Sequence, residues 1–167
     1  MKTYRPLFES HSYKEISLLS KFLKTAYNMD FIIIGGAAHS LYTGARAKDL
    51  DLVVKSLGTL KEEPDVKYNY VDPKGTPLKI SVKGVSIDLL YPGMDYGKFK
   101  IRSNFRYNTI KGNKVLSLED LMNTTKQKDR KVRFEELIRS QNLTVDFANK
   151  LDRKTKEDYI KIFNSLR

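Results

Sequence analysis

The chain has 167 residues, with 31 Lys and Arg against 20 Asp and Glu, a formal net charge of +11 and no cysteine. Disulfides and thiolate metal sites are therefore excluded, and with only His11 and His39 present we do not expect a histidine-based zinc centre. The basic excess favours a polyanionic partner such as a nucleic acid, although a solvated basic surface would give the same charge. No apolar run approaches membrane-spanning length and the polar first residues lack a signal-peptide core, so we expect a cytoplasmic protein with no membrane partner.

The first predicted element is a helix over residues 13–27. Ser12 and Glu15 have the spacing of a capping box. Apolar residues follow at helical spacing and predict a face that packs on a sheet: Ile16, Leu19, Phe22, Leu23 and Ala26. Residues 31–34 read Phe-Ile-Ile-Ile, and this β-branched run predicts a buried strand.

Gly35 and Gly36 follow that strand directly, and residues 37–42 suit a short helix, on which we expect His39 to be a packing group. A helix N-terminus presents free N–H groups and the positive end of a dipole, so it can accept a phosphate. Glycine allows the phosphate to approach the backbone closely, and we therefore expect Gly35 and Gly36 to bind one. Arg46 offers a planar fork for phosphate oxygens, or alternatively an ion pair with a nearby aspartate.

Asp49 and Asp51 open the next predicted strand, over residues 49–54. Residues i and i+2 of a strand point to the same face, so the two carboxylates should project side by side. Close carboxylates repel each other unless a cation lies between them, and Mg²⁺ commonly bridges such carboxylates to substrate phosphates. Alone, the pair also fits two solvated acids at a strand start, but the glycine pair upstream favours a metal site.

Asp88 lies in an apolar context within a predicted strand over residues 85–91. Burying a lone carboxylate is costly unless it is paired or bound to a metal. The alternative is an Asp that faces solvent near the strand end. We expect Asp88 to be a third acid of the site formed by Asp49 and Asp51.

Other segments complete a predicted α+β unit with a core over residues 1–115 and a C-terminal helical segment over residues 116–167 packed on it. Residues 92–97 should form a loop at the rim of the site, where substrate contact is common. Further strands are predicted at residues 65–71, 78–82 and 105–110, and further helices at residues 115–122, with Ser117 as N-cap, and 143–166.

The order of a strand, Gly35-Gly36 opening a helix, Asp49-x-Asp51 and the later Asp88 resembles the signature of the polymerase β-like nucleotidyltransferase superfamily. The spacer that contains Arg46 resembles the minimal nucleotidyltransferase and AbiEii-like toxin branch. The specific part of the resemblance covers residues 31–54 and Asp88. It implies a nucleotidyltransferase fold, with a mixed or antiparallel sheet flanked by helices and a C-terminal helical part.

The resemblance also implies a role for Lys126, which matches a lysine that the family places near the nucleotide. The alternative is that Lys126 belongs to a solvated basic face formed by residues 126–133. An acidic segment that often follows in the family is replaced here by residues 131–137.

The activity implied is transfer of a nucleoside monophosphate from ATP or another NTP to a hydroxyl of an RNA, a protein or a small molecule. Two Mg²⁺ or Mn²⁺ ions would be held by Asp49, Asp51 and Asp88. Two alternatives remain: a catalytically inactive member that binds nucleic acid, and a toxin–antitoxin component that acts on a partner protein. The acceptor, the base of the NTP and the oligomeric state are left open by the sequence.

Overall fold

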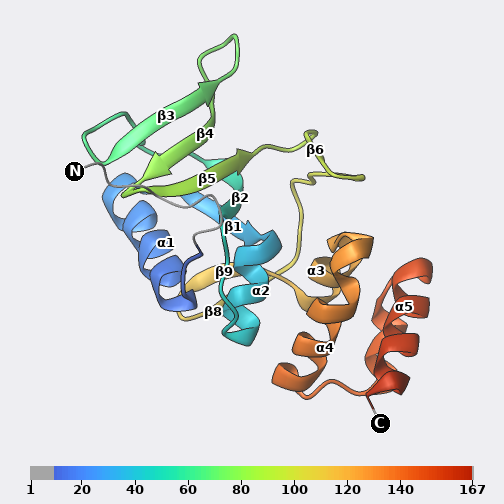
Figure 1. Ribbon diagram of the computed structural model, residues 1–167. Helices are drawn as coiled ribbons and strands as arrows, with labels where there is room; N and C mark the ends of the chain where they lie inside the picture. The colour runs from blue at the N-terminus through green and yellow to red at the C-terminus, as the bar shows by residue number, and fades with distance from the viewer. Residues whose placement is uncertain (1–9, 167) are drawn as a thin grey trace.

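The computed structural model describes residues 10–166 (Figure 1). Its strands are β1 (Asp30–Ile34), β2 (Leu50–Ser56), β3 (Val66–Val71), β4 (Pro77–Val82), β5 (Val85–Leu90), β6 (Asp95–Tyr96), β7 (Phe99–Lys100), β8 (Tyr107–Ile110) and β9 (Asn113–Leu116). Its α-helices are α1 (Tyr13–Tyr27), α2 (Gly35–Thr43), α3 (Leu118–Thr124), α4 (Arg130–Gln141) and α5 (Arg153–Ser165), with short 3-10 helices η1 (Gln127–Asp129) and η2 (Val145–Lys150). None of these helices in the described chain is long and apolar enough to cross a membrane.

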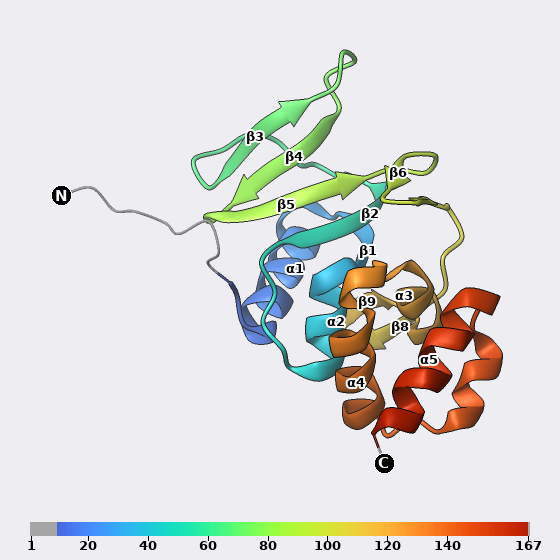
Figure 2. The same cartoon turned by 45° about the vertical axis from the view of Figure 1, so that its right-hand side comes forward.

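One mixed sheet of seven strands, in the order β3-β4-β5-β2-β1-β9-β8, forms the centre of the fold. Strand β2 runs antiparallel to β1 and parallel to β5, and β9 runs parallel to β1. Helices α1 and α2 lie on one side of this sheet, and the C-terminal helices lie beside α2 (Figures 1 and 2). The predicted α+β class, with a mixed sheet flanked by helices, is confirmed.

Helix α1 follows its local signals closely. Ser12 and Glu15 form the predicted capping box, and the helix spans the predicted residues. Its buried face includes Ile16 and Leu23 as expected, but Ala26 is exposed and Tyr27 is buried in its place. The apolar face turns toward the sheet, where β1 is almost completely buried along its length.

The predicted helix at residues 115–122 is wrong at its start, because Val115 and Leu116 belong to strand β9. A turn at Lys111 and Gly112, both with positive φ, brings β9 back antiparallel to β8. Val115 also pairs with Ile33 of β1, so this segment joins the central sheet, in line with the strand preference of Val. The helix begins only after Ser117, which caps α3 as predicted.

Two other segments also differ from the sequence interpretation. The expected rim loop contains a separate two-stranded sheet, in which β6 pairs with β7. The expected helix over residues 143–166 is divided into η2 and α5, because Asp152 is extended and caps α5 by accepting a hydrogen bond from the Thr155 N–H.

The C-terminal helices pack on each other and on α2. Phe134 of α4, Phe147 of η2, and Tyr159 of α5 form an aromatic cluster, with ring centroids 5.8–6.5 Å apart. A buried ion pair of 2.8 Å joins Arg130 of α4 to Asp158 of α5. Contact between α2 and α4 attaches this helical part to the sheet-containing part of the chain.

Candidate active site

Asp51 and Asp88 lie side by side because β2 and β5 are parallel neighbours whose register pairs these two residues. Both carboxylates leave the same face of the sheet, while Leu50 and Leu52 of β2 are completely buried on the other. One oxygen of Asp51, Oδ2, accepts a hydrogen bond of 2.7 Å from the Tyr96 hydroxyl. The other, Oδ1, is buried and has no hydrogen-bond partner.

Asp51 carries negative charge that its surroundings do not neutralise. Burial, together with the like charges of Asp88 and Asp49, raises the pKa of the Asp51 carboxyl to about 6, and the hydrogen bond from Tyr96 acts in the opposite direction. Asp88 has a cationic partner, since Lys79 Nζ lies 3.3 Å from its Oδ1. A buried oxygen without a partner, in a group whose charge is opposed by its neighbours, fits a site for a small cation.

Gly35 brings the start of α2 directly against Asp51. Its φ is +64°, a conformation that favours glycine, and a Cβ at this position would clash with the Tyr96 hydroxyl oxygen and lie 2.9 Å from Asp51 Oδ2. No side chain caps the N-terminus of α2. The glycine turn therefore presents uncapped backbone next to the carboxylate, and Gly36 follows it within the first turn of the helix.

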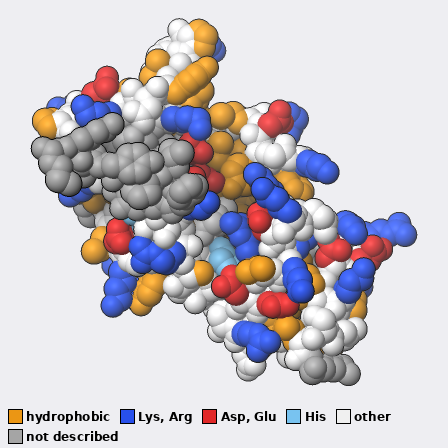
Figure 3. Space-filling view, in the orientation of Figure 1, with side chains coloured by type: hydrophobic (Ala, Val, Ile, Leu, Met, Phe, Trp, Pro, Cys, Tyr) orange, Lys and Arg blue, Asp and Glu red, His pale blue; other side chains and the backbone are white. Residues whose placement is uncertain are grey.

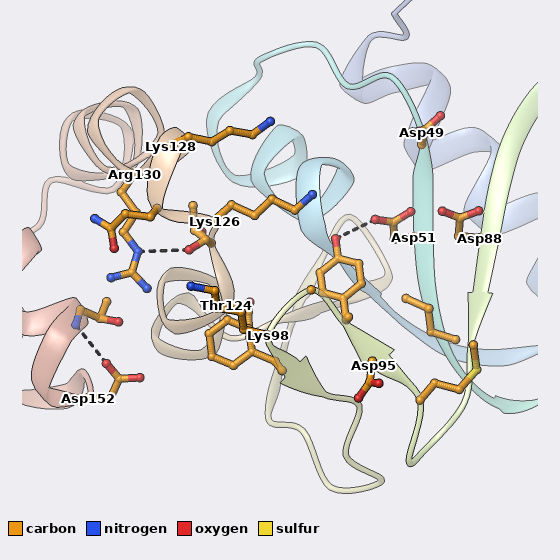
Figure 4. Close-up of a pocket in the computed structure, with 18 of the residues that line it drawn as sticks. Asp49, Asp51, Asp88, Asp95, Lys98, Thr124, Lys126, Lys128, Arg130 and Asp152 are labelled. Carbon is orange, nitrogen blue, oxygen red and sulfur yellow. Dashed lines mark hydrogen bonds between the residues drawn. The ribbon is translucent and has the colours of Figure 1, made fainter.

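A cleft of about 1400 Å³ extends from these acids to the C-terminal helices. Side chains that line it from the helical side include Lys126, Lys128 and Arg130, and those from the β6–β7 hairpin include Tyr96 and Lys98. In the close-up of Figure 4, Lys126 and Lys128 extend toward Asp51 across the cleft, and the dashed line at Asp51 marks the hydrogen bond from Tyr96. Asp49, Asp51 and Asp88 thus lie on one wall of the cleft, and Lys126 and Lys128 lie on the opposite wall, which also carries Asp152.

Figure 3 shows that Lys and Arg side chains are spread over both the sheet-containing part and the helical part on this face, mixed with acidic side chains. The basic excess of the chain is therefore not gathered into one patch on the visible surface. The cleft is distinguished by its arrangement of charges rather than by their number.

The structure does not bring Asp49 into a cluster with the other two acids. Asp49 lines the cleft and is exposed, and its carboxylate lies apart from the pair formed by Asp51 and Asp88 (Figure 4). Among residues 10–166, no three His, Cys, Asp or Glu side chains are arranged to hold a metal ion. Asp51 and Asp88 fit a divalent cation, whereas a three-acid metal site is not assembled and stays a prediction.

Arg46 lies away from the site, in contrast to both of its predicted roles. Its Nε donates to the Ser10 hydroxyl at 2.7 Å and its Nη2 to the Ser10 carbonyl at 2.6 Å. It is not among the residues that line the cleft. The guanidinium instead links the start of the described chain to the segment that precedes β2.

His39 is a packing group, as expected. It is buried on α2, and its Nε2 lies 2.9 Å from Glu136 Oε1 on α4. Burial lowers the pKa of His39, and the charge of Arg133 adds to this, while the hydrogen bond to Glu136 acts in the opposite direction. The contact connects the helix that opens at the glycine pair to the C-terminal helices.

Sequence reasoning missed Tyr96 and Lys79. The sequence does contain a signal for Lys79 as the partner of Asp88. The tight turn at Lys83 and Gly84 fixes the register of β4 on β5, and this register places Lys79 opposite Asp88. Tyr96 lies in the segment expected from sequence to be a loop at the rim of the site. No local signal identifies it as the partner of Asp51, since the β6–β7 hairpin is positioned by tertiary packing.

Comparisons with known proteins found one similar solved structure and no family or curated relative. No known protein family matches the sequence, and no curated protein sequence is similar to it. Among solved structures, the chain is similar to the crystal structure of an antigenic nucleotidyltransferase-like protein from Paracoccidioides brasiliensis, with 18% identity, a TM-score of 0.49, and coverage of 95% of this chain and 89% of that chain. The fold class stated above follows from the sheet and helices of this chain alone.

Proposed function

We propose that the chain is a nucleotidyltransferase that moves a nucleoside monophosphate from an NTP to a hydroxyl acceptor with the help of Mg²⁺. One observation carries the proposal: register places Asp51 and Asp88 together, directly against the glycine turn that opens α2. Lysines on the opposite wall of the same cleft supply the complementary charge. Carboxylates, an uncapped helix start and lysines around one cleft are the groups that phosphoryl transfer requires.

Each group would act through position and charge. The N–H groups at Gly35 and Gly36 would receive phosphate oxygens at the N-terminus of α2. Lys126 and Lys128 would balance the charge of the phosphates that leave as pyrophosphate. Asp88 would take the proton of the attacking hydroxyl after Lys79 has moved from its 3.3 Å contact.

The cation would be held by Asp51 and Asp88, with Asp49 joining them after a change of its exposed side chain. When bound, Mg²⁺ neutralises phosphate charge and lowers the pKa of the attacking hydroxyl. The unpartnered Asp51 Oδ1 supports this assignment, because a buried carboxylate oxygen without a donor has its charge uncompensated in the protein alone.

A second candidate is a protein that binds nucleic acid without catalysis. It is favoured by the net charge of +11 and by the lack of an assembled three-acid cluster within residues 10–166. Its binding should weaken steeply with salt and should not depend on Asp51 or Asp88. A role in a toxin–antitoxin pair remains a proposal about the acceptor, which would then be a partner protein.

The experiment that separates these candidates supplies the purified protein with Mg²⁺, each of four α-labelled NTPs, total RNA and cell lysate. The Asp51→Asn variant tests the site, and Asp146→Asn is the control, since Asp146 is an exposed acid of η2 that does not line the cleft. We expect label on an RNA or protein with the wild type and Asp146→Asn, and none with Asp51→Asn. Equal labelling by Asp51→Asn would refute the proposal, and nucleic-acid binding with no transfer by any variant would favour the second candidate.

A further inference from the structure

The Tyr96 hydroxyl lies at the point where the groups needed for nucleotidyl transfer meet. It donates a hydrogen bond of 2.7 Å to Asp51 Oδ2. The same oxygen lies against the start of α2, since a Cβ on Gly35 would clash with it. A hydroxyl, a carboxylate and the backbone proposed to receive phosphate are therefore in direct contact with one another.

Tyr96 also belongs to an element that is separate from the main sheet. It lies on β6, which forms a two-stranded sheet with β7 within the described chain, and this hairpin forms part of the wall of the cleft. The aromatic ring is half-buried, with its hydroxyl end toward Asp51. The Tyr96 hydroxyl therefore reaches Asp51 from the wall of the cleft.

We propose that Tyr96 is itself an acceptor, so that the protein transfers one nucleoside monophosphate to its own Tyr96 hydroxyl. This inference rests on the proposed function, because it uses the same carboxylates and the same NTP. It adds a modification site and a chemical class of acceptor, a phenolic hydroxyl of the same chain.

The step balances with an NTP as the only co-reactant. The Tyr96 oxygen forms a bond to the α-phosphorus, and the bond between the α-phosphorus and the oxygen bridging to the β-phosphorus breaks. Pyrophosphate leaves toward the wall that carries Lys126 and Lys128, and the phenolic proton passes to the neighbouring carboxylate and then to water. The product is a phosphodiester between Tyr96 and the nucleoside, with no change in oxidation state.

Three other tyrosines of the described residues lack this combination. Tyr70 also lines the cleft, but it lies on β3 and is 53% exposed. The Tyr91 hydroxyl donates to the Pro77 carbonyl at 2.7 Å. Tyr27 does contact a carboxylate, that of Glu63, but this pair lies outside the cleft. Only Tyr96 among these joins a carboxylate to the glycine turn.

Self-modification should also stop after one turnover. A phosphodiester at Tyr96 has no phenolic proton, so the hydrogen bond to Asp51 is lost, and the attached nucleotide occupies the cleft in which a second NTP would have to bind. We therefore expect at most one nucleoside monophosphate per chain.

The test incubates the purified full chain with Mg²⁺ and each α-labelled NTP, with no other acceptor. We expect intact mass to increase by one nucleotidyl group and peptide mapping to place it on Tyr96. Label should be lost in Tyr96→Phe and Asp51→Asn and retained in Tyr70→Phe, the matched control from the same cleft. Label on another residue, or label retained in Tyr96→Phe, would overturn the inference.

Two further measurements separate this inference from the proposed function. If the wild type labels RNA or a lysate protein but never Tyr96, the inference fails and the proposed function stands; if it labels nothing, both fail. Without turnover, an NTP analogue with a non-cleavable α,β-methylene bridge should bind in calorimetry and protect Tyr96 from nitration by tetranitromethane. Binding with no change in Tyr96 nitration would also overturn the inference.

Discussion

Replacing Gly35 by Ala should destabilise the protein and disturb the candidate site, whereas replacing its neighbour Gly36 should not. Gly35 has φ +64°, and an L-residue in that region costs roughly 1–2 kcal/mol. The added Cβ would also clash with the Tyr96 hydroxyl and displace it from Asp51. The hydrogen bond lost is one to a charged group, which is worth about 1.5–3 kcal/mol. We expect Gly35→Ala to lower the free energy of unfolding by about 3 kcal/mol.

Gly36→Ala is the matched control. The nearest atom to a Cβ at Gly36 is Arg133 Nη2 at 3.4 Å, and its φ is not in the left-handed region. Ala is favoured over Gly inside a helix by roughly 0.5–1 kcal/mol, so this change should be neutral or slightly stabilising. Urea unfolding followed by far-UV circular dichroism suits the comparison, because the chain has no Trp.

A double variant then tests whether the contact with Tyr96 is the cause. In Tyr96→Phe the hydroxyl is gone and the nearest ring atom to the Gly35 Cβ position is Cζ at 3.6 Å. The loss of unfolding free energy caused by Gly35→Ala should therefore be smaller by at least about 1 kcal/mol in the Tyr96→Phe background than in the wild type. The reasoning is refuted if Gly35→Ala is as stable as Gly36→Ala, or if its cost is unchanged by Tyr96→Phe.

Three further predictions concern charge. Without metal at pH 7.5, Asp51→Asn should raise the free energy of unfolding by about 1–3 kcal/mol, because the Asp51 pKa is about 6 in the folded state against an ordinary 3.8, so that its ionisation opposes folding. This gain should vanish below pH 3.8, and a loss of stability at pH 7.5 would contradict the prediction. Because burial lowers the pKa of His39, the unfolded chain takes up a proton on this imidazole at a higher pH than the folded chain does, so the free energy of unfolding falls as pH falls below 6.5. In urea titrations His39→Gln should reduce this loss of stability at low pH, and an unchanged pH dependence would argue against the prediction. Asp158→Ala leaves Arg130 buried without its partner and should lower the free energy of unfolding by about 3 kcal/mol. Lys154→Ala removes only the exposed lysine that contacts the same carboxylate and should lower it by less than about 1 kcal/mol in the same assay. Equal losses would contradict the buried-pair argument.

The sequence correctly predicted those elements that are determined by interactions between residues close together in the chain. The capping box at Ser12 and the turn into β1 are determined by neighbouring side chains, and α1 has the predicted bounds. The glycine pair predicted where α2 begins, because glycine adopts the positive φ found at Gly35 without steric cost. Alternation at the start of β2 predicted that Asp51 would point away from the face on which Leu50 and Leu52 are buried.

Local rules failed where distant segments compete for the same residues. Val115 and Leu116 were grouped with the helix that follows them but pair as β9 with β1 and β8, and these long-range strand partners cannot be read from the local sequence. Arg46 was expected near phosphate or the aspartates and instead binds Ser10. A long side chain with several donors takes whichever acceptor the fold brings within reach.

The sequence by itself determined the periodicity, the caps, the glycine turn and the acids that face one side of a strand, because these depend on backbone geometry over one or two turns. Only the tertiary structure decided which acid lies beside which, that Tyr96 donates to Asp51, and that Lys126 and Lys128 face them across a cleft. The reason is that strand order, the position of the β6–β7 hairpin and the packing of α4 on α2 are set by burial of apolar surface throughout the chain, which no short stretch of sequence contains.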